Sequence, residues 1–160
     1  QRPARGARGG AGPVRGADAA LAREFYRFAA DPSRGGPFGV GDIWLGIESG
    51  PTYVHVPAAQ LHDPNAWQVG EGYAERMGPF SPLDILASSG GYFEVHRGIL
   101  PTGGFEADDD EAPPELEGLR AITITIPRDA MMACMDWWGV TLFLDTQDHI
   151  LGVALRLGPP

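Results

Sequence analysis

Hydrophobic residues near the start of the chain recur with the period of a helix. The apolar residues of this run lie at positions i, i+4, i+7 and i+8, and they are Leu21, Phe25, Phe28 and Ala29. The spacing predicts an amphipathic helix over about residues 19–30. Asp18 stands where a helix cap is expected, and Asp31 before Pro32 is where the helix should end.

The pattern then changes to the alternation of half-buried strands. Residues 43–47 and 52–56 predict a hairpin in which both Val54 and Val56 point inward, and residues 92–96 predict a further strand. The last third of the chain alternates most regularly. Its three runs predict a meander over residues 121–126, 137–144 and 150–157.

The N-termini of two short helices are predicted between these strands. Asp63 precedes Pro64, and Ser81 precedes Pro82, which matches a polar cap followed by proline in the first helical position. The second of these helices should end near Ala87.

Together these elements predict a single α+β domain over residues 17–160. We expect a mostly antiparallel sheet of five to six strands with a C-terminal three-strand meander, and the N-terminal helix and the short helices packed on one face. Residues 1–16 contain mainly Gly, Pro, Ala and Arg, so we expect a flexible tail or linker there.

The ending WWGVTLFLDTQDHILGVALRLG, which follows an amphipathic helix, resembles nuclear-transport-factor-like cone domains. The resemblance is confined to the last quarter of the chain, and the intervening turns and helix depart from the cone pattern. It implies an α+β fold that encloses a pocket. No residue role is carried over from it.

Charge and composition narrow the classes of partner. The 160 residues carry a net charge of −9, which disfavours nucleic acid and anionic membranes and favours a basic protein partner. No apolar run is long enough for a transmembrane segment. All 12 basic residues are Arg, and with plentiful Gly, Ala and Pro this usage is typical of a GC-rich bacterial genome, such as an actinobacterial one.

Candidate catalytic chemistry is sparse. His55 and His96 lie on predicted strands, but their spacing does not require a metal site, and we expect neither metal nor cofactor. Cys134, the single cysteine, lies among methionines with no His nearby, which favours a small buried residue over a reactive thiol. His62 beside Asp63 and His149 in a polar turn need no catalytic role.

Two stretches are candidates for binding a partner. One crowds flexible and aromatic side chains at the entry to a strand, namely Met131, Met135, Trp137 and Trp138. An exposed tryptophan there would be a natural contact point for a partner, although burial in the core is the commoner fate of such a residue. The other is a long acidic loop over residues 99–118 whose most charged run is Asp108, Asp109, Asp110 and Glu111.

The sequence therefore favours a non-enzymatic, acidic protein-interaction domain, of which a toxin-neutralising immunity-type protein is one version. An alternative is a small-ligand or enzymatic pocket protein of the cone type. Its pocket residues would be Trp44, Tyr53, His55, His96 and Phe143. A second alternative is a secreted or envelope-tethered domain, and the sequence leaves both the cytoplasm and an exported location open.

Overall fold

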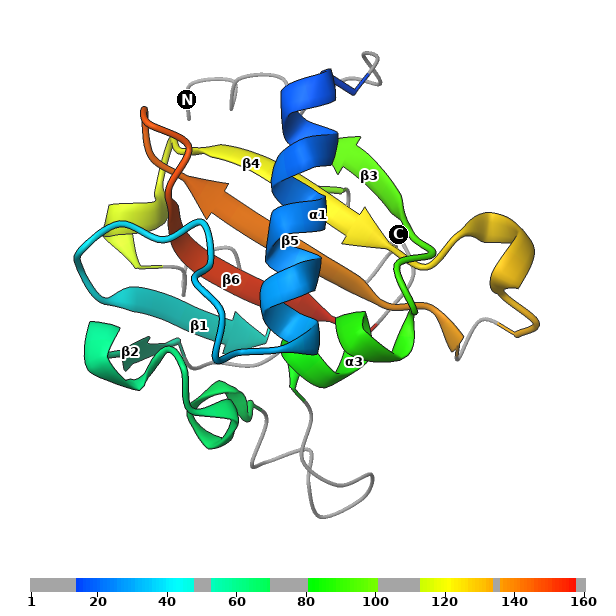
Figure 1. The fold of residues 1–160 in the computed structure, drawn as a ribbon. Coiled ribbons are helices and arrows are strands. Elements are labelled where there is room, and N and C mark those ends of the chain that lie inside the picture. The colour runs from blue at the N-terminus through cyan, green and yellow to red at the C-terminus, as the bar shows by residue number, and fades with distance from the viewer. Residues whose placement is uncertain (1–13, 48–52, 70–80, 101–112, 134–135, 158–160) are drawn as a thin grey trace.

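The computed structural model describes residues 14–47, 53–69, 81–100, 113–133 and 136–157. Within these ranges two α-helices and six strands carry the fold (Figure 1). They are α1 (Gly16–Ala30), β1 (Ile43–Ile47), β2 (Val54–Val56), α3 (Pro82–Ser88), β3 (Glu94–Arg97), β4 (Arg120–Thr125), β5 (Gly139–Leu144) and β6 (Ile150–Arg156). Short 3₁₀ turns cover Ala58–Gln60, Pro64–Trp67, Pro114–Leu116 and Arg128–Ala130.

The six strands form one sheet in the order β2-β1-β6-β5-β4-β3. Four of its five pairings are antiparallel, and the fifth, between β1 and β6, is parallel. The predicted α+β class with a mostly antiparallel sheet and a C-terminal meander is therefore confirmed. The parallel pairing, in which Trp44 lies opposite Gly152, makes the sheet mixed.

Both helices cover the same face of the sheet, and α1 runs across it with α3 beside it (Figure 1). The main core fills the space between this helical layer and the strands, and Phe25, Leu45 and Leu142 in it are completely buried. The Pro64–Trp67 turn closes the core on the β1 side. There Trp67 is also completely buried and donates from Nε1 to the carbonyl oxygen of Leu61 at 2.9 Å.

The predicted caps of the short helices are present. Ser81 Oγ accepts a hydrogen bond from the Leu83 amide, and Asp63 Oδ1 accepts one from the Asn65 amide. The predicted cap of α1 is wrong, because the helix begins earlier and is capped by the backbone of Arg15. Asp18 lies inside the first turn instead, with only 1% of its surface exposed.

The prediction that both valines of β2 point inward is half right. Val56 is buried, whereas Val54 is 45% exposed although it lies on the same face. The physical reason is the position of β2 at the edge of the sheet, where it has a neighbouring strand on one side alone. The expected strand 92–96 is displaced by two residues at its start, since pairing with β4 begins at Glu94.

The sheet face opposite the helices carries a second, smaller apolar cluster. Its buried members are Leu116, Ala121, Phe143 and Ala154, with Trp44, Tyr53, Leu119 and Leu151 partly buried against them. Beside this cluster the face is polar. Thr123 and Thr141 share a hydrogen bond of 3.1 Å between their hydroxyl groups, and both are buried.

Candidate functional site

A surface depression lies between α1 and the turn that joins β5 to β6. Its volume is about 410 Å³, and it is open to solvent along much of its perimeter. Four of its lining residues are small or apolar, namely Ala17, Ala20, Leu21 and Pro37. The remaining lining residues, Glu24, Gln147, Asp148 and His149, bring mostly acceptor groups. The depression therefore combines small or apolar lining residues with polar and acidic ones, and the polar lining residues of the β5–β6 turn are called its wall.

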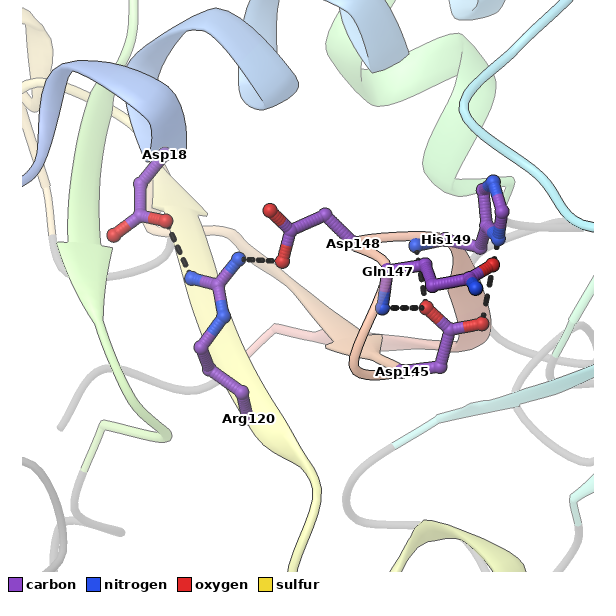
Figure 2. A network of polar contacts seen from close by, with 6 residues as sticks. All are labelled: Asp18, Arg120, Asp145, Gln147, Asp148 and His149. Carbon is purple, nitrogen blue, oxygen red and sulfur yellow. Dashed lines mark hydrogen bonds and ion pairs between the residues drawn. The ribbon is translucent and has the colours of Figure 1, made fainter.

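A three-residue charge network joins the β5–β6 turn to α1. Arg120, at the start of β4, donates from Nη1 to Asp18 on α1 and from Nη2 to Asp148 in the β5–β6 turn (Figure 2). The Asp18 carboxylate is buried, whereas the side chains of Arg120 and Asp148 are 35% and 53% exposed. The network ties together three segments that are more than 25 residues apart in the sequence.

Electrostatics hold Arg120 in its charged form. Burial disfavours the charge, but the hydrogen bonds to Asp148 and Asp18 outweigh it, and the pKa of Arg120 is raised above its ordinary value. The second carboxylate oxygen of Asp18, Oδ2, is buried and has no hydrogen-bond partner among the described residues. Arg120 is therefore the group that compensates this buried charge, and its own charge is already matched by two carboxylates.

The β5–β6 turn is organised by Asp145. Its Oδ1 accepts hydrogen bonds from the backbone amides of Gln147 and His149, both at 2.8 Å (Figure 2). The bond from the His149 amide is the main reason that the pKa of Asp145 lies below its ordinary value. The same carboxylate lies 3.4 Å from Nδ1 of His149 through Oδ2, so the turn holds a histidine ring beside an acid at the wall of the depression.

Asp148 has an uncommon backbone conformation. Its φ angle is +62°, and among the described residues it is the one non-glycine residue in this region. Side chains other than those of Gly, Asn and Asp are disfavoured there because Cβ approaches the backbone. In this conformation the Asp148 side chain points toward Arg120 and pairs with it.

The two tryptophans of the predicted Trp/Met segment pack against the rest of the protein. Trp137 is 8% exposed and lies beneath the Arg156 guanidinium at 5.5 Å, and Trp138 packs against the main core. Met131 is half-buried, whereas its neighbour Met132 is 95% exposed. Some candidates of both binding stretches lie outside the described residues, namely Met135, Asp108, Asp109, Asp110 and Glu111, as does Cys134.

Most of the residues proposed for the alternative pocket are brought together. Trp44, Tyr53 and Phe143 belong to the small cluster on the face opposite the helices, and His55 lies against Trp44 with ring centroids 3.6 Å apart. His96 lies elsewhere. Its Nε2 lies 2.9 Å from the hydroxyl oxygen of Thr125 on β4. His96 itself belongs to β3, the strand at the opposite edge of the sheet, which is about 24 Å from β2 because five strand spacings separate the two.

The two strand histidines therefore do not meet. Within the described ranges no group of three or more His, Cys, Asp or Glu residues is arranged to hold a metal ion. The same part of the chain contains no helix with the length and apolarity needed to cross a bilayer.

The network was missed by the sequence reasoning, although one signal for it was present. Asp18 precedes Leu21 by three residues and Phe25 by seven, so it belongs to the buried stripe of α1 rather than to its cap. A carboxylate on a buried stripe needs a cationic partner. The identity of that partner depends on the fold, because Arg120 is 102 residues away along the chain.

Comparison with protein-family models, with curated proteins and with solved structures gives no significant match.

Proposed function

We propose that the chain is a non-enzymatic, acidic interaction domain that binds a basic protein partner and receives an arginine or lysine side chain in the depression beside α1. The observation that carries this proposal is the lining of the depression, which combines small or apolar residues with acceptor groups. Arginine and lysine side chains have the matching form, with an apolar stem and a cationic head.

Charge supports a cation as the occupant. Glu24, Asp145 and Asp148 are acidic residues at or beside the depression, and Arg120 is already paired with Asp148 and Asp18. Over the longer range, positions 17–160 contain 21 acidic residues and 8 arginines, so a basic partner would be attracted before contact. Neutralisation of a basic cognate toxin is one concrete form of this function.

The open shape supports a protein side chain over an enclosed small molecule. Small-molecule sites usually bury most of the ligand in a concave and mainly apolar pocket. An open surface depression can receive a side chain while the backbone of that residue stays outside. The rest of a protein partner can therefore extend from the bound residue in both directions.

The test is a titration of the full chain, labelled with ¹⁵N, with acetyl-arginine-N-methylamide as the probe. We expect amide shifts in α1 residues 17–24 and turn residues 145–149, with an affinity near 1 mM, about −4 kcal/mol. Binding should weaken as salt is raised, because exposed charges are screened. Glu24→Gln should weaken it severalfold, and Glu115→Gln, an exposed control on the Pro114–Leu116 turn, should leave it unchanged.

Shifts confined to another surface, or no shifts at 10 mM probe, would overturn the proposal. Equal weakening by Glu24→Gln and Glu115→Gln would also contradict it, since that result would indicate attraction by net charge alone.

One observation favours a second candidate, a small-ligand pocket protein. His149 lies at the wall of the depression with the Asp145 carboxylate 3.4 Å from its Nδ1, which is the kind of pair that orients a general base. Free arginine and agmatine, titrated in the same way, separate the two candidates. A pocket protein should bind one of these small molecules at least 100-fold more tightly than acetyl-arginine-N-methylamide.

A further inference from the structure

The loop at residues 37–42 lies beside the depression and is held at both of its ends. At one end the carbonyl oxygen of Pro37 accepts a hydrogen bond from the Ile150 amide at 2.8 Å. Phe38 then packs in the core with its ring centroid 4.9 Å from that of Phe28. At the other end Asp42 Oδ1 accepts a hydrogen bond from the Ala58 amide at 3.1 Å. The loop is therefore anchored at both ends.

Between these anchors one apolar side chain is completely exposed. Val40 has a relative exposure of 102%, the highest among the large hydrophobic residues that the structure describes. Single exposed apolar residues are common on protein surfaces, and exposure alone indicates nothing about function. The position of Val40, on an anchored loop and between two glycines, is what distinguishes it.

Val40 lies on the loop that borders the depression. Pro37 is one of the lining residues, and Gly39 is so close to the turn that a Cβ atom added there would lie 3.6 Å from Nδ1 of His149. An apolar projection thus stands next to an acidic depression. A protein segment that places a basic side chain in the depression brings its neighbouring residues within reach of Val40.

We infer that Val40 is the apolar anchor of the same binding surface, and that the partner carries an aliphatic side chain close to its basic residue. This inference rests on the proposed function and adds the chemistry of the partner to it. The charged wall supplies attraction and orientation, while burial of the two Val40 methyl groups against an aliphatic side chain supplies affinity that salt does not screen. An extended chain advances about 3.4 Å per residue, so an aliphatic residue two positions from the basic residue of the partner lies about 7 Å from it.

The experiment compares two peptides on the full chain, acetyl-Leu-Gly-Arg-amide and acetyl-Gly-Gly-Arg-amide, by titration with NMR detection of the amide and Val40 methyl signals. We expect the leucine peptide to bind about fivefold more tightly. Val40→Ser should abolish that difference and leave the affinity of the glycine peptide unchanged. Val54→Ser, at an exposed valine on β2, is the matched control and should preserve the difference.

The outcomes separate this inference from the function on which it rests. If both peptides bind at the depression with equal affinity, the role of Val40 is refuted and the basic-partner function stands. If neither peptide binds, the proposed function itself fails. If Val40→Ser and Val54→Ser reduce the preference for leucine equally, the contact is not specific to the loop and the inference is overturned.

Discussion

Replacement of Asp148 tests whether the wall of the depression is held by backbone conformation, by charge, or by both. The residue has φ of +62° and pairs with Arg120. Three substitutions divide these two contributions. Asp148→Asn keeps a side chain that tolerates the left-handed region and removes the charge. Asp148→Ala removes the charge and adds backbone strain, and Asp148→Gly removes both the charge and the strain.

The structure gives the expected size of each effect. The ion pair lies between two partly exposed side chains, so its loss in Asp148→Asn should cost about 0.5–1 kcal/mol. Alanine in the left-handed region costs about 1–2 kcal/mol more. Asp148→Ala should therefore be destabilised by about 2 kcal/mol. Asp148→Gly should be about 1 kcal/mol more stable than Asp148→Ala, because the strain is relieved while the unfolded chain gains freedom.

Urea unfolding at pH 7 gives these free energies by linear extrapolation, with the thermal midpoint as a second readout. For a domain of this size 1 kcal/mol corresponds to a midpoint shift of about 2–4 °C. Equal stability of the alanine and glycine variants would refute the left-handed conformation of residue 148. An asparagine variant as stable as the unmodified chain would show that the pair with Arg120 contributes nothing.

Three further predictions follow from the same network and from the core. Arg120→Met should destabilise the fold by about 3–5 kcal/mol, since the buried carboxylate of Asp18 loses its cation, and the double change Asp18→Leu/Arg120→Met should recover most of that loss in urea unfolding. The lowered pKa of Asp145 stabilises the fold above the unfolded value near 3.9, and this contribution is lost as pH falls through the folded pKa. Asp145→Asn should therefore flatten the dependence of stability on pH as the pH falls below the unfolded pKa. Trp67→Phe should cost about 2–4 kcal/mol, measured by urea unfolding, through a cavity and the orphaned carbonyl of Leu61.

Each of these has a result that contradicts it. A stable Arg120→Met protein would show that Asp18 is reached by water or by another donor. An unchanged pH profile in Asp145→Asn would place the acid sensitivity elsewhere, with Asp31, whose pKa is also lowered, as the next group to test. A Trp67→Phe variant as stable as the unmodified chain would mean that the Pro64–Trp67 turn does not close the core.

The fold was largely predictable because its signals are local. Alternation over residues 121–126, 137–144 and 150–157 indicated three strands, and the structure has all three with shifts of at most two residues at their ends. The caps at Ser81 and Asp63 were readable because a polar cap and the following proline are neighbours in sequence. The helical spacing in α1 indicated the right face, although not the right first turn.

The site was not predictable, since it depends on long-range pairing. The parallel contact of β1 with β6 is invisible to periodicity, and it decides that His55 and His96 lie at opposite edges. One of Trp137 and Trp138 was a candidate for exposure because consecutive residues of a strand lie on opposite faces, but Arg156 and the main core cover most of their surface. Burial of this kind depends on which distant strand end lies nearby.

The position of β6 in the sheet has a consequence for the order in which the protein acquires its structure. β6 lies between β1 and β5, and it is synthesised after the other five strands. Until it emerges, β2-β1 is a two-stranded ribbon without a neighbour and β5-β4-β3 is a separate three-stranded unit. Pairing of Ile47 with Leu155 closes a loop of more than 100 residues, which makes folding slow relative to local helix and hairpin formation. Nascent chains released before residue 150 should accordingly be aggregation-prone, with two unpaired strand edges where the completed sheet has its centre.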